Sequence, residues 1–143
     1  MHSTHVMEMN SIRRVLLHGG TDESFDAAAR FAVRMVDTFG AELHVVYVVE
    51  EPLSAGWTAE VTPDKLPELH QAIEEEARER LARLMPNGQD SVVIAIRTGG
   101  DAAAELTRYT AENSIDLAIL QRSDDQAHAM LDKGRCALLV LRA

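Results

Sequence analysis

The chain is poor in cysteine and in aromatic residues: its 143 residues include one Cys, and Phe, Trp and Tyr together make up 4%. It also lacks a long apolar run. A lone Cys136 cannot form an internal disulfide, which fits a reducing compartment, so we expect a cytoplasmic protein. A membrane-spanning helix needs about 18 consecutive apolar residues, and no run approaches that length. The first residues also lack the basic and then apolar pattern of a secretory signal. We therefore expect no membrane insertion.

Basic residues are scarce as well, with 14 Lys and Arg against 23 Asp and Glu and a net charge of −9. Polyphosphates attract basic surfaces, so nucleic acid is not an expected partner. The six histidines form no HExxH motif or Cys–His cluster, and we expect no metal site. His18, with Asp22 nearby, could act as a general acid or base. A packed or solvated histidine is the commoner case, and no serine or cysteine nucleophile is clearly paired with it, so we expect no catalytic residues and no enzyme.

What the sequence does contain is a regular alternation of apolar runs and helical patterns, which suits one α/β domain. Strands are expected at Val15–Leu17, Leu43–Val49, Val92–Ile96, Leu117–Leu120 and Ala137–Leu141. Helices are expected at Phe25–Phe39, Leu66–Leu84, from Asp101 to about Asn113, and over a short stretch at Asp125–Lys133. The continuous apolar strands indicate a mainly parallel sheet that is covered on both faces. Such sheets bind ligands beyond the carboxyl ends of their strands, so the loops after the first and fourth strands matter most.

Charged residues at the ends and along the helices support these assignments. Asp101 is placed to cap the third helix. On the second helix, Glu74 with Arg78 and Glu76 with Arg80 are i,i+4 pairs in the favourable order.

The stretch HGGTDES, residues 18–24, joins the first strand to the first helix. Two glycines at such a junction can expose backbone N–H groups to a phosphate. The stretch resembles the SGGxDS loop of the PP-loop ATP pyrophosphatases, although His18 replaces the serine and Glu23 intervenes before Ser24. Gly19 and Gly20 are thus a candidate anion contact, and a turn that needs positive φ or close packing is the alternative.

A wider resemblance comes from the sequence around this loop. Residues 13–50, RRVLLHGGTDESFDAAARFAVRMVDTFGAELHVVYVVE, resemble the opening of a universal stress protein (UspA-like) domain. The resemblance continues through GGDAAAELTRYTAENSIDLAILQ at 99–121 and resumes at CALLVL, 136–141, which is similar to the family's "CPVLVV" ending.

That resemblance implies a single doubly wound, Rossmann-like domain of the adenine nucleotide alpha hydrolase-like type, with five strands in the order 3-2-1-4-5. The domain would occupy residues 12–143 after a flexible tail, 1–11. It also implies a homodimer through the last strand, which agrees with the physical need to cover an apolar sheet edge. The strand residues concerned are Ala137, Leu138, Leu139, Val140 and Leu141.

Members of this family that bind ATP carry an aspartate at the end of the first strand. They also carry G-x2-G-x9-G-[ST] after the fourth strand. Counting back from Gly40, the aspartate position falls on Gly20 and the helix-starting serine on Asp22, which we expect to cap the helix. In the second motif, Gln121 stands at the position of the first glycine. Asp124-Asp125 stand at the positions of the last glycine and its Ser or Thr, and only two residues separate Gln121 from Asp124. The glycine loop is therefore missing, and two carboxylates stand where phosphate would bind.

The sequence thus predicts a non-catalytic stress-response or adaptor module that uses no cofactor and does not bind ATP or AMP. We also expect that the module can bind another protein. One alternative is a nucleotide-binding regulator with a rebuilt cleft at Gly19, Gly20 and Arg122. The weaker alternative is an adenylating enzyme of the PP-loop type.

Overall fold

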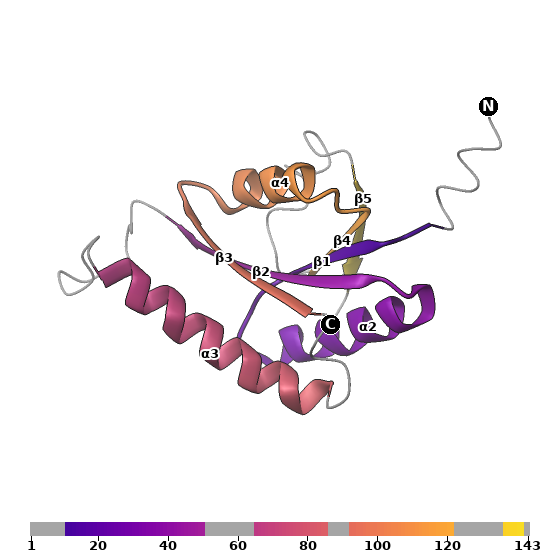
Figure 1. The fold of residues 1–143 in the computed structure, drawn as a ribbon, viewed down its shortest axis with the longest axis horizontal. Coiled ribbons are helices and arrows are strands. Elements are labelled where there is room, and N and C mark those ends of the chain that lie inside the picture. Colours follow the sequence, from indigo (N-terminus) through magenta and orange to yellow (C-terminus); the bar gives the residue numbers. More distant parts are fainter. Residues whose placement is uncertain (1–10, 51–64, 86–91, 122–135, 142–143) are drawn as a thin grey trace.

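The fold was established from a computed structural model, which describes residues 11–50, 65–85, 92–121 and 136–141. Along this part of the chain, strands and helices alternate (Figure 1). The elements are β1 (Arg14–His18), α2 (Glu23–Phe39), β2 (Glu42–Glu50), α3 (Leu66–Leu84), β3 (Val92–Gly99), α4 (Ala102–Glu112), β4 (Leu117–Gln121) and β5 (Ala137–Leu141). Residues 1–10 of the expected tail and the expected helix at 125–133 lie outside the described residues.

The five strands form one sheet in the order β3-β2-β1-β4-β5, and each neighbouring pair is parallel. The predicted α/β class and strand order are therefore confirmed. None of the described helices is both long enough and apolar enough to cross a membrane.

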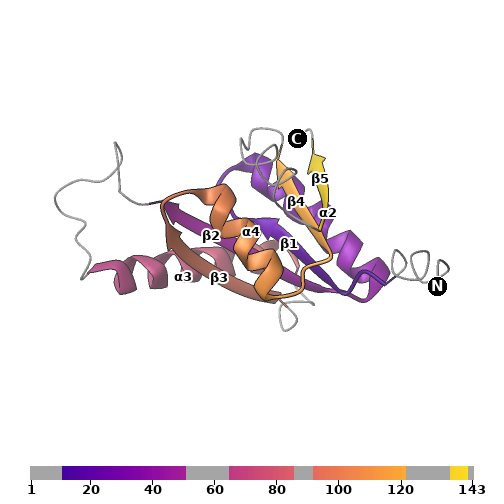
Figure 2. The same ribbon diagram turned by 90° about the horizontal axis from the view of Figure 1, so that it is seen from above.

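Helices cover both faces of the sheet, which explains why the strand sequences are apolar without alternation. Helices α2 and α3 lie on one face and α4 on the other (Figure 1). Seen from the α4 side, α4 lies over β1, β2 and β3, and β5 forms the sheet's edge beyond β4 (Figure 2). Alternate residues of β1 enter different cores: Leu17 packs with Phe25 of α2, and Leu16 packs with Leu106 of α4.

The ends of the helices follow the expected capping pattern. The carboxylate of Asp22 accepts a hydrogen bond from the backbone N–H of Phe25 at 2.9 Å, and that of Asp101 accepts one from Ala104. Helix α2 ends at Gly40, which adopts a left-handed conformation with φ 64° and donates its N–H to Val36. The predicted N-caps Asp22 and Asp101 and the predicted stop at Gly40 are confirmed.

Strand β3 is longer than predicted. It continues past Ile96 to Gly99, paired with β2 as far as Glu50. The apolar pattern ends where Arg97 and Thr98 begin, but backbone pairing with β2 carries the strand on. The guanidinium of Arg97 lies 5.0 Å from the centre of the Tyr109 ring, so a polar residue finds a partner on α4.

Candidate functional site

The two glycines after β1 are held by the chain itself. The backbone N–H of Gly19 donates to the carbonyl of Val46 at 2.7 Å. A Cβ atom at Gly19 would lie 2.6 Å from three ring carbons of Tyr47, and the Tyr47 hydroxyl donates to the carbonyl of Gly20 at 3.3 Å. Neither glycine has a positive φ. Close packing against Tyr47 therefore accounts for Gly19.

The N-termini of the two helices that begin at this edge of the sheet are occupied by carboxylates. Asp22 caps α2, and Glu23 and Asp26 add negative charge to its first turn. At α4, Asp101 caps the helix and the carboxylate of Glu50, at the end of β2, accepts a hydrogen bond from Ala102 at 3.1 Å. These free N–H groups and the helix dipole are what usually attract a phosphate. Here the N–H groups of Phe25, Ala102 and Ala104 already donate to carboxylates.

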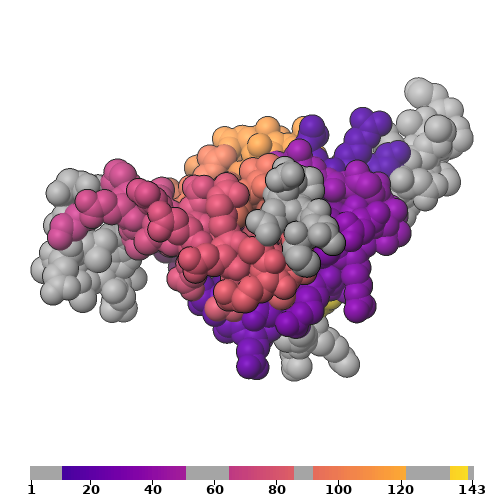
Figure 3. All heavy atoms as spheres, turned by 60° about the horizontal axis from the view of Figure 1, so that its bottom comes forward, coloured from indigo at the N-terminus to yellow at the C-terminus, as the bar shows by residue number. Residues whose placement is uncertain are grey.

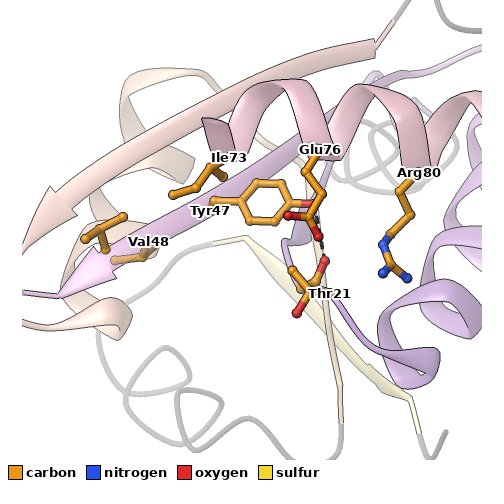
Figure 4. A pocket seen from close by; sticks show the side chains of 9 residues that line it. Thr21, Tyr47, Val48, Ile73, Glu76 and Arg80 are labelled. Carbon is orange, nitrogen blue, oxygen red and sulfur yellow. Dashed lines mark hydrogen bonds between the residues drawn. The ribbon is translucent and has the colours of Figure 1, made fainter. Parts of the chain in front are cut away.

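A pocket of about 170 Å³ opens between the β1–α2 turn, the end of β2 and helix α3 (Figure 4). It lies on the sheet face that carries α2 and α3, which are side by side at the surface in Figure 3. Its walls are mostly hydrocarbon and its polar groups are few. The lining residues are Gly20, Thr21, Tyr47, Val48, Val49, Ile73, Glu76, Ala77 and Arg80.

The charged groups around this pocket come from both helices. Arg80 donates through Nη1 to both carboxylate oxygens of Asp26, at 2.8 and 3.0 Å, and these bonds raise the pKa of Arg80. Its buried Nε has no partner among the described residues. Burial raises the pKa of Tyr47 to about 12, although the nearby charge of Arg80 acts in the opposite direction, so the phenol is neutral at ordinary pH. Asp26 and Glu76 together outweigh Arg80 by one negative charge.

The predicted local pairs on α3 are only half right. Glu74 and Arg78 form an i,i+4 ion pair, 3.1 Å between Oε2 and Nε. Arg80, by contrast, directs its hydrogen bonds to Asp26 of α2 and not to Glu76. The helix-to-helix pair is half-buried, where charges attract more strongly than at the surface, and this explains the preference.

The histidines occupy separate places. His18 ends β1 and is half-buried. His44 is buried, and both of its ring nitrogens have partners at 2.6 Å: Nε2 the carboxylate of Glu42 and Nδ1 the hydroxyl of Tyr109. His70 bonds Thr98 at 2.7 Å. Over the described ranges, no group of three or more His, Cys, Asp or Glu side chains could hold a metal ion.

The candidate cleft is only partly within the described residues. Gly19 and Gly20 lie at the carboxyl edge of the sheet, as expected, whereas Arg122 and the pair Asp124-Asp125 lie outside the described residues. The cleft of Gly19, Gly20 and Arg122 therefore stays a prediction.

The residues that form the pocket beside Gly20 were not predicted from the sequence. Ile73, Glu76, Ala77 and Arg80 recur at helical spacing, which could have marked one face of α3. Tyr47, the one aromatic residue in a run of aliphatic ones, was the other available signal.

The parallel sheet with helices on both faces defines a Rossmann-like α/β protein, a class in which ligands usually bind beyond the carboxyl ends of the strands. Comparison with known proteins agrees with this fold. The universal stress protein family matches residues 12–133, and the chain belongs to that family. No curated protein matches the chain significantly.

Three solved structures of the same fold are similar to this chain over nearly their whole length. A universal stress protein family member from Burkholderia pseudomallei has a TM-score of 0.66 and 22% identity, covering 93% of this chain and 98% of that one. UspA from Lactobacillus plantarum has a TM-score of 0.65 and 20% identity, covering 92% and 98%. A universal stress protein from Archaeoglobus fulgidus in complex with dAMP has a TM-score of 0.62 and 10% identity, again covering 92% and 98%. At these identities the likeness establishes the fold.

Proposed function

We propose that this universal stress protein family member is a non-catalytic stress-response or adaptor module that does not bind ATP or AMP. The observation that carries the proposal is the state of the N–H donors at the carboxyl edge. Gly19 donates to Val46, Phe25 donates to Asp22, and Ala102 donates to Glu50. A phosphate that used these donors would have to displace the Val46 carbonyl from Gly19 or a carboxylate from Phe25 or Ala102, and it would still lie near the displaced carboxylate. Like charges a few ångströms apart repel by about 1 kcal/mol in water and by more where they are partly buried.

The sequence supports the same proposal. Gly20 stands where ATP-binding relatives carry an aspartate, and Asp124-Asp125 stand where they carry the last glycine and its Ser or Thr. His44 and His70 are bonded to Tyr109, Glu42 and Thr98, which suits a structural role for both rings.

A nucleotide-binding regulator is the second candidate, because the pocket adjoins Gly20 of the predicted cleft. Two structural neighbours are named as complexes, one with cAMP and one with dAMP. In this chain such a ligand would need Gly19, Gly20 and Arg122 to form a rebuilt cleft.

The proposed partners are a second copy of the chain and, through that dimer, another protein in the cytoplasm. The dimer would form through β5, which is paired only with β4 among the described strands. Its Val140 side chain is 45% exposed, an apolar group that a second copy could cover.

Isothermal titration with Mg-ATP and with AMP tests the nucleotide part of the proposal. We expect no saturable heat at micromolar nucleotide and no pyrophosphate or phosphate release. Native mass spectrometry of freshly purified protein is the matching control, because it reports any nucleotide retained from the cell. A micromolar dissociation constant, or an added mass of AMP or ATP on each subunit, would place the regulator first. Turnover would show an enzyme.

A further inference from the structure

We propose that the pocket between α3, the end of β2 and the β1–α2 turn binds a small organic ammonium ion that carries one ring or a short hydrocarbon chain. The inference deepens the proposed function, on which it rests for the exclusion of phosphate, and it names a ligand class for the same edge of the sheet. Four features of the described residues carry it: the size of the pocket, its hydrocarbon walls, its aromatic ring and its surplus negative charge.

The size of the pocket limits the ligand to about one ring. An apolar cavity of about 150 Å³ accommodates benzene, and this pocket measures about 170 Å³. Pockets for drug-sized ligands usually span roughly 300–1,000 Å³. A six-membered ring with one or two further atoms therefore fits inside the pocket, whereas most of a nucleotide would lie outside it.

The walls favour a hydrocarbon body. Val48 and Val49 contribute aliphatic surface from β2, and Ile73 and Ala77 contribute it from α3. Figure 4 shows Val48 and Ile73 at the pocket. Tyr47 adds an aromatic ring, held in place on one side by Gly19 and at its hydroxyl by the carbonyl of Gly20. A rigid aromatic ring beside aliphatic side chains attracts both apolar groups and cations.

The charge of the pocket selects the sign of the ligand. Arg80 is engaged by Asp26 through two hydrogen bonds, so its charge is compensated within the protein. Glu76, one turn before Arg80, is exposed at the pocket and forms no ion pair within the described residues, although Arg80 attracts it at longer range. Asp26, Arg80 and Glu76 together therefore leave one negative charge. A bound ammonium would restore neutrality, while a bound carboxylate or phosphate would add a second negative charge beside Glu76.

Three probes with the same ring and different charge test this selection: benzylammonium, benzyl alcohol and benzoate. Each is titrated into the protein while the methyl NMR signals of Val48, Val49 and Ile73 are followed. We expect saturable shifts with benzylammonium and binding weaker by about tenfold or more with benzoate. Benzoate binding as tightly as benzylammonium, or the absence of saturable shifts with all three probes, would overturn the proposal.

A matched pair of variants separates Glu76 from the general acidity of α3. Glu76→Gln should weaken benzylammonium by about tenfold, because it removes the surplus charge. Glu79→Gln makes the same change on the exposed surface of the same helix, outside the pocket lining, and should leave the affinity unchanged. Equal weakening by both variants would show attraction to the whole acidic surface and would contradict a site at Glu76.

Adding Mg-ATP to the same NMR sample keeps the two proposals apart. Shifts of these methyl signals with ATP would contradict the proposed function and leave the ammonium result standing. Failure of benzylammonium to bind, with ATP also silent, would overturn the ligand class alone.

Discussion

At the scale of single residues, the contact between Gly19 and Tyr47 determines the form of the β1–α2 turn. A glycine pair in this position suggests a phosphate loop, but the missing side chain of Gly19 is what gives the Tyr47 ring its place. Tyr47 in turn bonds the carbonyl of Gly20 and lines the pocket. One aromatic residue on β2 thus closes the turn on one side and shapes a cavity on the other.

Gly19→Ala should therefore destabilise the fold. The new methyl group would lie 2.6 Å from ring carbons of Tyr47, and overpacking of this kind raises the free energy of the folded state by about 1–3 kcal/mol. Urea denaturation measures the change in the free energy of unfolding.

Two comparisons test the cause. In a Tyr47→Val background the cost of Gly19→Ala should shrink, because the ring is gone. Gly40→Ala is the control, since Gly40 has φ +64° with nothing within 4 Å of an added Cβ, so its strain should not depend on residue 47. An unchanged cost of Gly19→Ala without the ring would refute the packing explanation.

At the scale of elements, the ion pair between Asp26 and Arg80 joins α2 to α3 beside the pocket. Its side chains are 23% and 20% exposed, whereas Glu74 and Arg78 of the local pair are 43% and 54% exposed. Water screens the second pair more than the first, so the two pairs should differ in strength although both are well within hydrogen-bonding distance.

Double-mutant cycles to alanine at each pair measure this difference. We expect a coupling of about 0.3–0.5 kcal/mol for Glu74–Arg78, typical of an exposed i,i+4 pair. The coupling of Asp26 with Arg80 should be larger, on the order of 1–2 kcal/mol, because the pair is half-buried and holds two hydrogen bonds. Equal couplings would mean that this ion pair does not hold the helices together.

How far the sequence predicts these elements depends on whether their cause is local. Periodicity predicted the bounds of α3 and β5, and capping chemistry predicted the N-caps Asp22 and Asp101. The strand order followed from the family resemblance. The end of β3 did not, because polar Arg97 and Thr98 stay in the strand through pairing with β2.

The candidate site shows the same limit. Its location at Gly19 and Gly20 was predictable from the chain order of strands and helices. Two other contacts depend on tertiary packing. Tyr47 packs against Gly19, and Arg80 bonds to Asp26, which is 54 residues away in the chain. Local spacing favoured Glu76 as the partner of Arg80 and could not reveal the competitor on α2.

At the scale of the whole molecule, the sheet has two edges that present similar apolar residues to solvent. Val93 on β3 is 37% exposed and Val140 on β5 is 45% exposed. The two edges differ in their surroundings: helices α3 and α4 both contact β3, whereas α4 lies away from β5 (Figure 2). An edge strand with few neighbours and apolar side chains is the one that a second copy would cover.

Replacing each exposed valine with lysine tests which edge joins two copies. Sedimentation velocity should show a dimer for the parent protein, a monomer for Val140→Lys and a dimer for Val93→Lys. In a two-fold dimer each subunit contributes the same residue to the interface. One substitution therefore introduces two like charges into the contact. The same change on β3 alters net charge and edge polarity equally and controls for both. A monomeric parent protein, or dissociation by Val93→Lys with Val140→Lys still dimeric, would rule out β5 as the dimer edge. The pocket, formed by β2, α3 and the β1–α2 turn, lies on the other side of β4 from that edge. The monomeric variant should therefore retain ammonium binding, which would show that each subunit holds a complete site.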